Sequence, residues 1–178
     1  MYLRKKRIYN PKINTYVYQK QFYLMTTRFN NDTYLQNRQF VKQNPKIKCV
    51  YGSPILNADI VPIDKCIMIL EMNNEENRIE GIGFVKNHPI HSKYRIYDTT
   101  NRNRFVYLGK QHISRNEMTE EEEIIMKFFD IICFHGKRHL KRGCGITSFP
   151  HEILYKCKYR LDLIDFLYKM YNRRFVQK

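Results

Sequence analysis

The sequence predicts an α+β protein in which a mostly β-structured centre is packed by helices from both ends of the chain. Residues 65–72 form a continuous apolar run, which is typical of a strand covered on both faces. Residues 119–134 and 150–173 carry apolar side chains at helical spacing. A chain of 178 residues without repeats or a long linker favours one domain. We expect a basic N-terminal arm over residues 1–15 and a single domain over residues 16–178.

The first part of this domain is expected to hold one strand and one helix. Residues 16–27 are rich in β-forming side chains and predict a strand. Residues 32–43 predict a helix, because Asn31 or Asp32 can cap its start. Pro45 then prevents the helix from continuing.

The middle of the chain is expected to form a sheet. A polar turn follows the first apolar strand and leads into a second strand, so the two predict a hairpin. Gly81 and Gly83, inside the second strand, mark a bulge, a bend or the close approach of another backbone or a ligand. A further hairpin is expected later in the chain. The strands of the two expected hairpins are residues 65–72 with 78–86 and residues 93–98 with 104–108.

Both expected C-terminal helices carry start signals. Thr119 and Glu122 form a capping box, and Pro150 fits the first turn of the last helix. In that last helix, the side chains expected to face the core are Ile153, Cys157, Leu161, Ile164, Tyr168 and Tyr171.

Positive charge dominates the composition and is concentrated near the N-terminus. The chain has 32 Lys and Arg against 17 Asp and Glu, and residues 1–49 hold 11 basic residues and one acidic residue. Such asymmetry predicts a polyanionic partner, most simply nucleic acid. The alternative is a basic surface that only keeps the protein soluble. No membrane partner is expected, because no apolar run approaches the roughly 20 residues of a transmembrane helix.

The segment 135–145 is the strongest candidate for a binding site. It combines basic side chains, which attract phosphate, with glycines, which let backbone N–H groups approach an anion. The alternative is a helix C-terminus closed by a glycine cap, without any ligand. The expected contacts to nucleic acid are Lys137, Arg138, His139, Lys141 and Arg142, interspersed with Gly136, Gly143 and Gly145.

A second basic group is interleaved with aromatic residues, a combination that suits single-stranded nucleic acid because rings stack on bases while cations hold phosphates. Its alternative is ordinary cross-strand pairing of Tyr with Arg. The group comprises Arg102, Arg104, Lys110, His112 and Arg115 with Tyr97, Phe105 and Tyr107. The basic arm is expected to add salt-sensitive affinity through Arg4, Lys5, Lys6 and Arg7.

No complete catalytic motif is present, and we expect no cofactor and no metal. Zinc stays open as an alternative, because Cys133, His135, His139 and Cys144 lie within twelve residues. An enzyme would use Glu71, Glu80 or this same segment as its reactive groups. Asn10, Pro11 and Lys12 interrupt the place where a signal peptide needs its apolar stretch, which predicts an intracellular protein. The five cysteines are odd in number and widely spaced, and in an intracellular protein they are expected to be reduced thiols.

Three stretches, residues 70–87, 94–115 and 139–147, resemble an uncharacterised protein family encoded by giant DNA viruses. The pattern around Ile79–Gly83 also resembles the PUA-like superfamily, which includes ASCH, EVE and YTH domains. The second resemblance implies a compact mixed β-barrel or strongly curved sheet, flanked by N-terminal and C-terminal helices, that binds RNA or modified bases. The chain has no tryptophan, on which a YTH-type cage relies, so no residue of such a cage can be assigned.

Together these features predict a nucleic-acid-binding module, with RNA favoured over DNA, that acts in viral gene expression or genome handling. Its expected location is the host cytoplasm, the nucleus or the virion. A nuclease or a hydrolase of nucleotides or modified bases is one alternative, and a basic virion packaging protein is another. The sequence preference of the module and its oligomeric state stay open.

Overall fold

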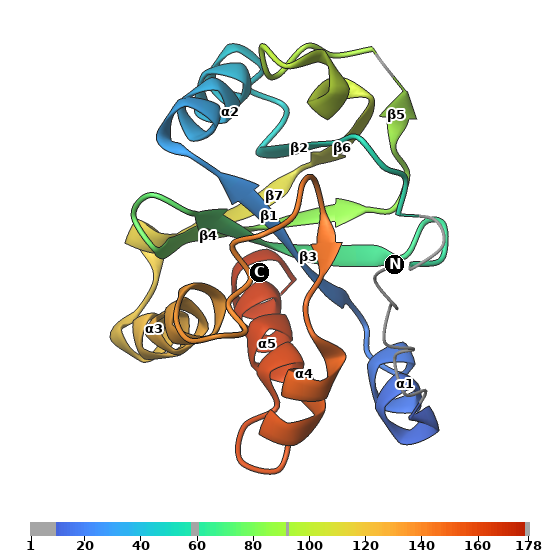
Figure 1. Ribbon diagram of the computed structural model, residues 1–178, viewed down its shortest axis with the longest axis vertical. Coiled ribbons are helices and arrows are strands. Elements are labelled where there is room, and N and C mark those ends of the chain that lie inside the picture. Colours follow the sequence, from blue (N-terminus) through green and yellow to red (C-terminus); the bar gives the residue numbers. More distant parts are fainter. Residues whose placement is uncertain (1–9, 58–60, 92, 177–178) are drawn as a thin grey trace, which may run out of the picture. The chain divides into compact units, whose positions relative to one another are not determined.

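The computed structural model describes residues 10–57, 61–91 and 93–176 (Figure 1). These residues form an α+β structure, as the sequence predicts, and they are arranged in two compact units. The central unit is Phe22–Phe149. The terminal unit combines the described residues up to Gln21 with those from Pro150 onward.

A five-stranded sheet forms the core of the central unit, in the order β7-β4-β3-β1-β8. Its strands are β1 (Tyr23–Phe29), β3 (Cys66–Asn73), β4 (Arg78–Lys86), β7 (Gln111–Ser114) and β8 (Thr147–Ser148). Strand β1 runs parallel to β3, and the other pairs are antiparallel. The expected β3–β4 hairpin is therefore confirmed. Its register shifts between Leu70 and Met72, where two residues of β4, Glu80 and Gly81, stand opposite the single residue Glu71, so the bulge lies on β4.

A second sheet has three strands in the order β2-β6-β5. Its strands are β2 (Cys49–Ser53), β5 (Ile90–His91) and β6 (Phe105–Gly109). Only Lys110 separates β6 from β7, so one run of chain passes from the second sheet into the first (Figure 1). Neither sheet closes into a barrel within the described residues.

The expected hairpin between residues 93–98 and 104–108 is wrong. Residues 93–98 form no strand, and β6 pairs with β2 and β5 instead. The side chain of Asn103 explains the difference. Its Oδ1 accepts hydrogen bonds from the N–H groups of Ile96 and Tyr97 at 2.9 and 3.0 Å, and its Nδ2 donates to the Tyr97 carbonyl at 2.6 Å. One side chain thus satisfies the backbone groups that a partner strand would otherwise bind.

Two α-helices and two short 3-10 helices complete the central unit, namely α2 (Asn31–Gln43), α3 (Glu120–Phe134), η1 (Thr100–Asn103) and η2 (Arg115–Glu117). The expected helix over residues 32–43 is confirmed, but its cap is Asn30, whose Oδ1 accepts from the Thr33 N–H at 2.8 Å. The capping box of Thr119 and Glu122 is present at the start of α3.

The terminal unit consists of the helices α1 (Pro11–Tyr18), α4 (His151–Cys157) and α5 (Leu163–Phe175). The strand expected within residues 16–27 is present and begins at Tyr23, because Asn10 and Pro11 start a helix first. The part of the basic arm that holds Arg4, Lys5, Lys6 and Arg7 lies outside the described residues.

The long helix expected over residues 150–173 is divided in two. The Asp162 side chain caps α5 by accepting from the Asp165 N–H at 3.2 Å, so the chain restarts a helix there. This break changes which side chains face the core. Of the expected core stripe only Ile164 is fully buried, and Leu161 is exposed. The fully buried side chains of these two helices are Leu154, Leu163, Ile164, Leu167 and Met170.

A buried ionic cluster joins four elements of the central unit. The Glu71 carboxylate on β3 is fully buried. Its Oε1 accepts from the Tyr51 hydroxyl on β2 at 2.7 Å and from Arg38 on α2 at 2.9 Å. Its Oε2 lies 3.1 Å from Nε2 of His112 on β7, which donates because an ionised carboxylate only accepts. We call Glu71, Arg38, Tyr51 and His112 the Glu71 cluster.

The two glycines of β4 make room for this cluster. A Cβ on Gly83 would overlap the Tyr51 hydroxyl, and a Cβ on Gly81 would lie 2.8 Å from His112 Nε2. Another backbone approaches closely only at Gly81, where a Cβ would also lie 2.8 Å from the Ile113 carbonyl oxygen, whereas a side chain fills the space at Gly83. Burial opposes ionisation of Glu71, but the nearby His112 and Arg38, with hydrogen bonds from His112 and Tyr51, outweigh it and lower its pKa from 4.5 to about 2.

Replacing Glu71 should destabilise the central unit most at neutral pH. Because the folded-state pKa lies below the ordinary value, this carboxylate stabilises the fold above about pH 5, and the contribution is lost as the pH falls toward about 2. We expect Glu71→Gln to lower the free energy of unfolding by about 3 kcal/mol at pH 7 and by much less at acidic pH. Urea titrations followed by circular dichroism at both pH values measure this difference.

The matched control is Glu121→Gln, which removes an equal charge from an exposed position on α3. It should change the stability by less than about 0.5 kcal/mol at either pH. Equal losses in the two variants would mean that the Glu71 cluster does not stabilise the fold.

Candidate nucleic-acid interface

The basic loop, residues 135–145, connects α3 to β8 in the central unit (Figure 1). Three of its residues have backbone conformations that favour glycine, with φ values of +79° at Gly136, +126° at Gly143 and +69° at Gly145. A Cβ on Gly145 would also overlap the Ser53 hydroxyl at the end of β2. The glycines that the sequence analysis singles out therefore set the path of this loop and allow it to pack closely on β2.

Arg28 on β1 binds the basic loop and the strand that follows it. Its Nε donates to the Leu140 carbonyl at 2.6 Å, and its Nη1 donates to the Thr147 hydroxyl at 2.8 Å. The Asn74 side chain, in the turn between β3 and β4, donates to the Lys141 carbonyl at 3.0 Å. Side chains from two separate segments of the central unit thus bind the backbone of the loop.

The charge of Arg28 is not balanced by a carboxylate within the described part of the chain. The side chain is half-buried, and this burial lowers its pKa. Its Cζ would lie 3.4 Å from a Cβ on Gly143, so the guanidinium lies directly against the loop backbone. A half-buried cation without a counter-ion is unfavourable, and an anion bound at the loop would relieve this.

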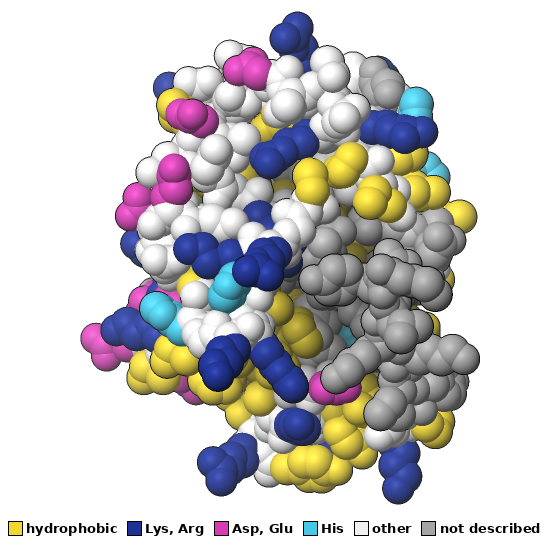
Figure 2. Space-filling view, viewed as in Figure 1, with side chains coloured by type: hydrophobic (Ala, Val, Ile, Leu, Met, Phe, Trp, Pro, Cys, Tyr) yellow, Lys and Arg dark blue, Asp and Glu magenta, His cyan; other side chains and the backbone are white. Residues whose placement is uncertain are grey.

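The outer side of the loop is also basic. Lys137, Arg138 and Arg142 are exposed, and no ion pair is found for them among the described residues. Lys141 is half-buried, and its Nζ donates to Asn77 Oδ1 at 2.8 Å. His139 is half-buried as well, and its Nδ1 accepts from the Lys141 N–H at 3.3 Å. Figure 2 shows Lys and Arg side chains gathered in the middle of this face, over the segment between α3 and β8.

The structure brings part of the second basic group toward the same place. Ser53, on which Gly145 packs, pairs with Phe105 at the start of β6. Phe105 is half-buried, and the exposed Arg104 lies over its ring at 5.3 Å from Cζ to the centroid. A cation and an aromatic ring therefore lie close to the anchored end of the basic loop.

Other members of that group do not join this surface. Tyr97 and Tyr107 are buried, and their hydroxyls bind the Asn37 side chain at 3.1 Å and the Asn57 N–H at 3.2 Å. Their expected role as rings that stack on bases therefore does not fit the structure.

Arg115 is buried too, and it forms ion pairs with Glu123 at 2.6 Å and Asp130 at 2.9 Å. It links α3 to the Ile79 carbonyl of β4 instead of binding phosphate. His112, from the same group, is engaged in the Glu71 cluster. Arg102 is half-buried, with its carbonyl against Gly52, and Lys110 is exposed at the far end of β6.

The four side chains that left zinc open as an alternative, at positions 133, 135, 139 and 144, do not form a metal site in the structure. Cys133 is buried in α3, where burial raises the pKa of its thiol to about 12, whereas Cys144 is exposed in the loop. The described residues include no cluster of three or more His, Cys, Asp or Glu side chains able to hold a metal ion. All five cysteines are free thiols.

The carboxylates weighed for catalysis have structural partners. Glu71 has no exposed surface, and both of its oxygens are engaged in the Glu71 cluster. Glu80 is half-buried, and its Oε1 accepts from the Asn73 side chain at 3.2 Å. A general base must reach the substrate proton, and the position of Glu71 prevents this.

Comparison with known proteins adds no assignment, because no protein-family model matches the chain and no curated protein matches it. Among the described helices, none combines the length and the apolar character needed to cross a membrane.

Arg28 is the residue of this interface that the sequence analysis misses. One signal was available, since a single cation stands between Thr27 and Phe29 within a strand of otherwise buried residues. A lone arginine on a buried strand needs a partner, and here that partner is a loop more than 100 positions away.

Removing the Arg28 guanidinium should loosen the basic loop. We expect Arg28→Met to accelerate trypsin cleavage after the basic residues of the loop by about tenfold, because it removes one charge-assisted hydrogen bond to the loop and a second to Thr147, just after it in β8. Mass spectrometry of the timed digest locates each cut. Arg95→Met, at an exposed position, is the control. Cleavage at the same rate in both variants would show that the loop is held without Arg28.

Proposed function

We propose that the protein binds nucleic acid through the basic loop. The observation that carries this proposal is Arg28, a half-buried cation that lies against the loop backbone and has no carboxylate partner among the described residues. Three exposed cations on the same loop, Lys137, Arg138 and Arg142, add further positive charge. Phosphate groups supply the anions that this arrangement lacks.

A polymer of phosphates fits this surface better than a single small anion does. The cations are spread along the loop, and Arg104 with Phe105 lies beyond its anchored end. A ring next to a cation can hold an unpaired base beside its phosphate. We therefore propose single-stranded nucleic acid as the ligand.

The preference for RNA is part of the proposal and rests on the resemblance to PUA-like domains. Action in viral gene expression or genome handling, inside the infected cell, belongs to the same proposal. The free thiols of the five cysteines fit such a location.

Reversing two loop charges tests the proposal. Arg138→Glu/Arg142→Glu should weaken binding of a labelled single-stranded RNA at least about tenfold and make the salt dependence shallower by about 1.4 in log–log slope. Fluorescence anisotropy from about 50 to about 200 mM salt, with matched RNA and DNA strands, measures both quantities.

The control variant is Lys46→Glu/Lys48→Glu, which makes the same change in net charge. These two exposed lysines precede β2, at the opposite end of the strand from Ser53. The control should lose less than about threefold in affinity. An equal loss in both variants, or binding to heparin as tight as to RNA, would indicate a packaging protein attracted by net charge and would overturn the proposed interface.

A further inference from the structure

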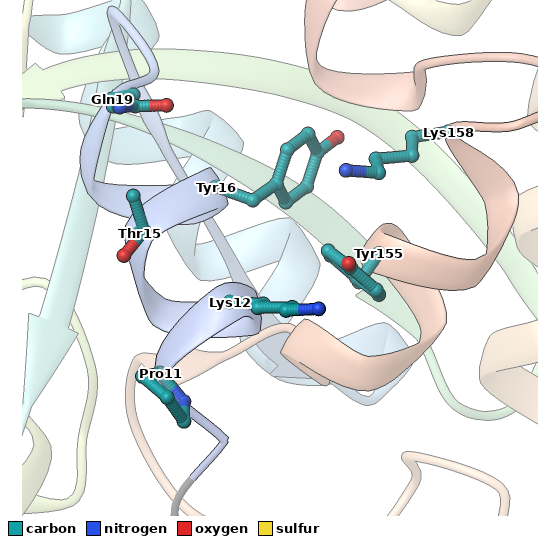
Figure 3. A pocket seen from close by; sticks show the side chains of 7 residues that line it. All are labelled: Pro11, Lys12, Thr15, Tyr16, Gln19, Tyr155 and Lys158. Atoms are coloured by element: carbon teal, nitrogen blue, oxygen red, sulfur yellow. The ribbon is translucent and has the colours of Figure 1, made fainter.

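The terminal unit carries a pocket of about 380 Å³ between α1 and α4 (Figure 3). This volume lies within the range of roughly 300–1,000 Å³ found for small-ligand sites. Two lysines, two tyrosines and polar groups line the pocket, and no carboxylate does. The lining residues used below are Lys12, Thr15, Tyr16, Gln19, Tyr155 and Lys158.

Lys158 lies at the centre of an aromatic cluster. Its Nζ is 4.1 Å from the ring centroid of Tyr155, 4.9 Å from that of Tyr16 and 5.1 Å from that of Tyr159. In Figure 3 the Tyr16 ring and the Lys158 ammonium group point toward each other from α1 and from the end of α4. Contacts with ring faces fix the position of an ammonium group but do not neutralise it. The cation is therefore held in place and stays available to an anion.

The nearby acidic residues do not compensate the pocket lysines. Asp162 and Asp165 pair with Lys20 at 2.6 and 2.8 Å, and Asp162 also accepts from the Tyr16 hydroxyl at 2.9 Å. Within the described part of this unit, Lys12 and Lys158 have no ion pair. The described residues 10–21 and 150–176 hold eight Lys and Arg against three Asp and Glu. The pocket thus lies on a basic unit in which Lys20 engages two of the three carboxylates, Asp162 and Asp165.

Aromatic surface is exposed beside this charge. Tyr159 is 73% exposed and lies edge-on to Tyr155, with a distance of 5.9 Å between ring centroids. An exposed ring can stack on a base, and the adjacent ammonium groups can hold the phosphate of the same nucleotide. A ligand that carries both a flat aromatic group and a negative charge matches the two kinds of surface together.

We infer that this pocket, together with the Tyr159 ring beside it, binds one nucleotide of a single-stranded nucleic acid, with the base against Tyr159 and Tyr155 and the phosphate at Lys12 and Lys158. The inference rests on the proposed function and extends it to a second contact, on the terminal unit. Thr15 and Gln19 supply polar groups from α1 for the sugar or the base edge. Binding at two separate surfaces of one chain strengthens the total affinity when both engage the same strand.

A tryptophan reporter tests the inference directly, because the natural chain has no tryptophan. Tyr159→Trp replaces an exposed ring and keeps an aromatic surface for stacking. Oligoadenylate of about ten nucleotides should quench the emission of the introduced indole on binding, since a stacked base lies against that ring. Tyr18→Trp, at a position 56% exposed that neither lines the pocket nor is one of the three rings around Lys158, should show no quenching.

Substitution of the pocket residue Lys158 gives a second test of the inference. In the Tyr159→Trp background, Lys158→Met should weaken the quenching isotherm about fivefold or more and lower its salt slope by about 0.7. Lys156→Met, at an exposed position on the same helix, should leave both nearly unchanged. Adenosine monophosphate should compete for the site at lower concentration than inorganic phosphate does, because phosphate alone lacks the base.

The outcomes separate this inference from the proposed function. If anisotropy detects binding that depends on Arg138 and Arg142 while the Tyr159→Trp variant shows no quenching, the pocket assignment is wrong and the basic loop stands. If the Tyr159→Trp variant is quenched and the loop variant binds normally, the pocket stands and the proposed interface is wrong. Quenching that is equal in the Tyr18→Trp and Tyr159→Trp variants, or that survives Lys158→Met unchanged, also overturns the pocket assignment.

Discussion

The central unit depends on keeping the charge of Glu71 compensated inside the protein. A buried carboxylate is tolerated only when opposite charges and hydrogen bonds surround it. Here the partners come from three different elements, with Arg38 from α2, Tyr51 from β2 and His112 from β7. A shift of β3 by one residue would turn Glu71 to the other face of the sheet and leave these groups without it. The cluster therefore ties the register of the larger sheet to the position of the smaller sheet and of α2.

The same unit contains a second charge, that of the partly buried Arg28, which has no oppositely charged partner among the described residues. Glu71 has a partner for each oxygen, whereas Arg28 contacts only a carbonyl and a hydroxyl within the described residues. The two side chains stand on neighbouring parallel strands, β3 and β1. Stability alone explains the first arrangement, because every charge there is balanced. The second arrangement suits a surface that receives its negative charge from a ligand.

The β3–β4 hairpin, α2 and α3 could be predicted from the sequence. Apolar runs, turn residues and helix caps are signals formed by residues only a few positions apart. The elements that differ from the prediction are determined by contacts between residues farther apart in the sequence. Asn103 replaces the partner strand expected for residues 93–98. Asp162 restarts a helix at a site where Lys20, from the other end of the chain, binds the same carboxylate. For the candidate interface, the basic residues and glycines of the loop were enough to predict it. The burial of Tyr97 and the position of Arg28 depend on strand pairing, which the sequence alone does not reveal.

The chain order of the two units has a consequence for synthesis. Strands β1 and β8 are neighbours, and the Phe149 N–H donates to the Leu24 carbonyl at 3.1 Å, so the central unit begins and ends at one place. That unit is an insertion between the two halves of the terminal unit. On the ribosome, all of its residues emerge before those of α4 and α5. Helix α1, although made first, gains its contacts with α4 only when the last residues arrive, so the N-terminal helix is among the last elements to be completed.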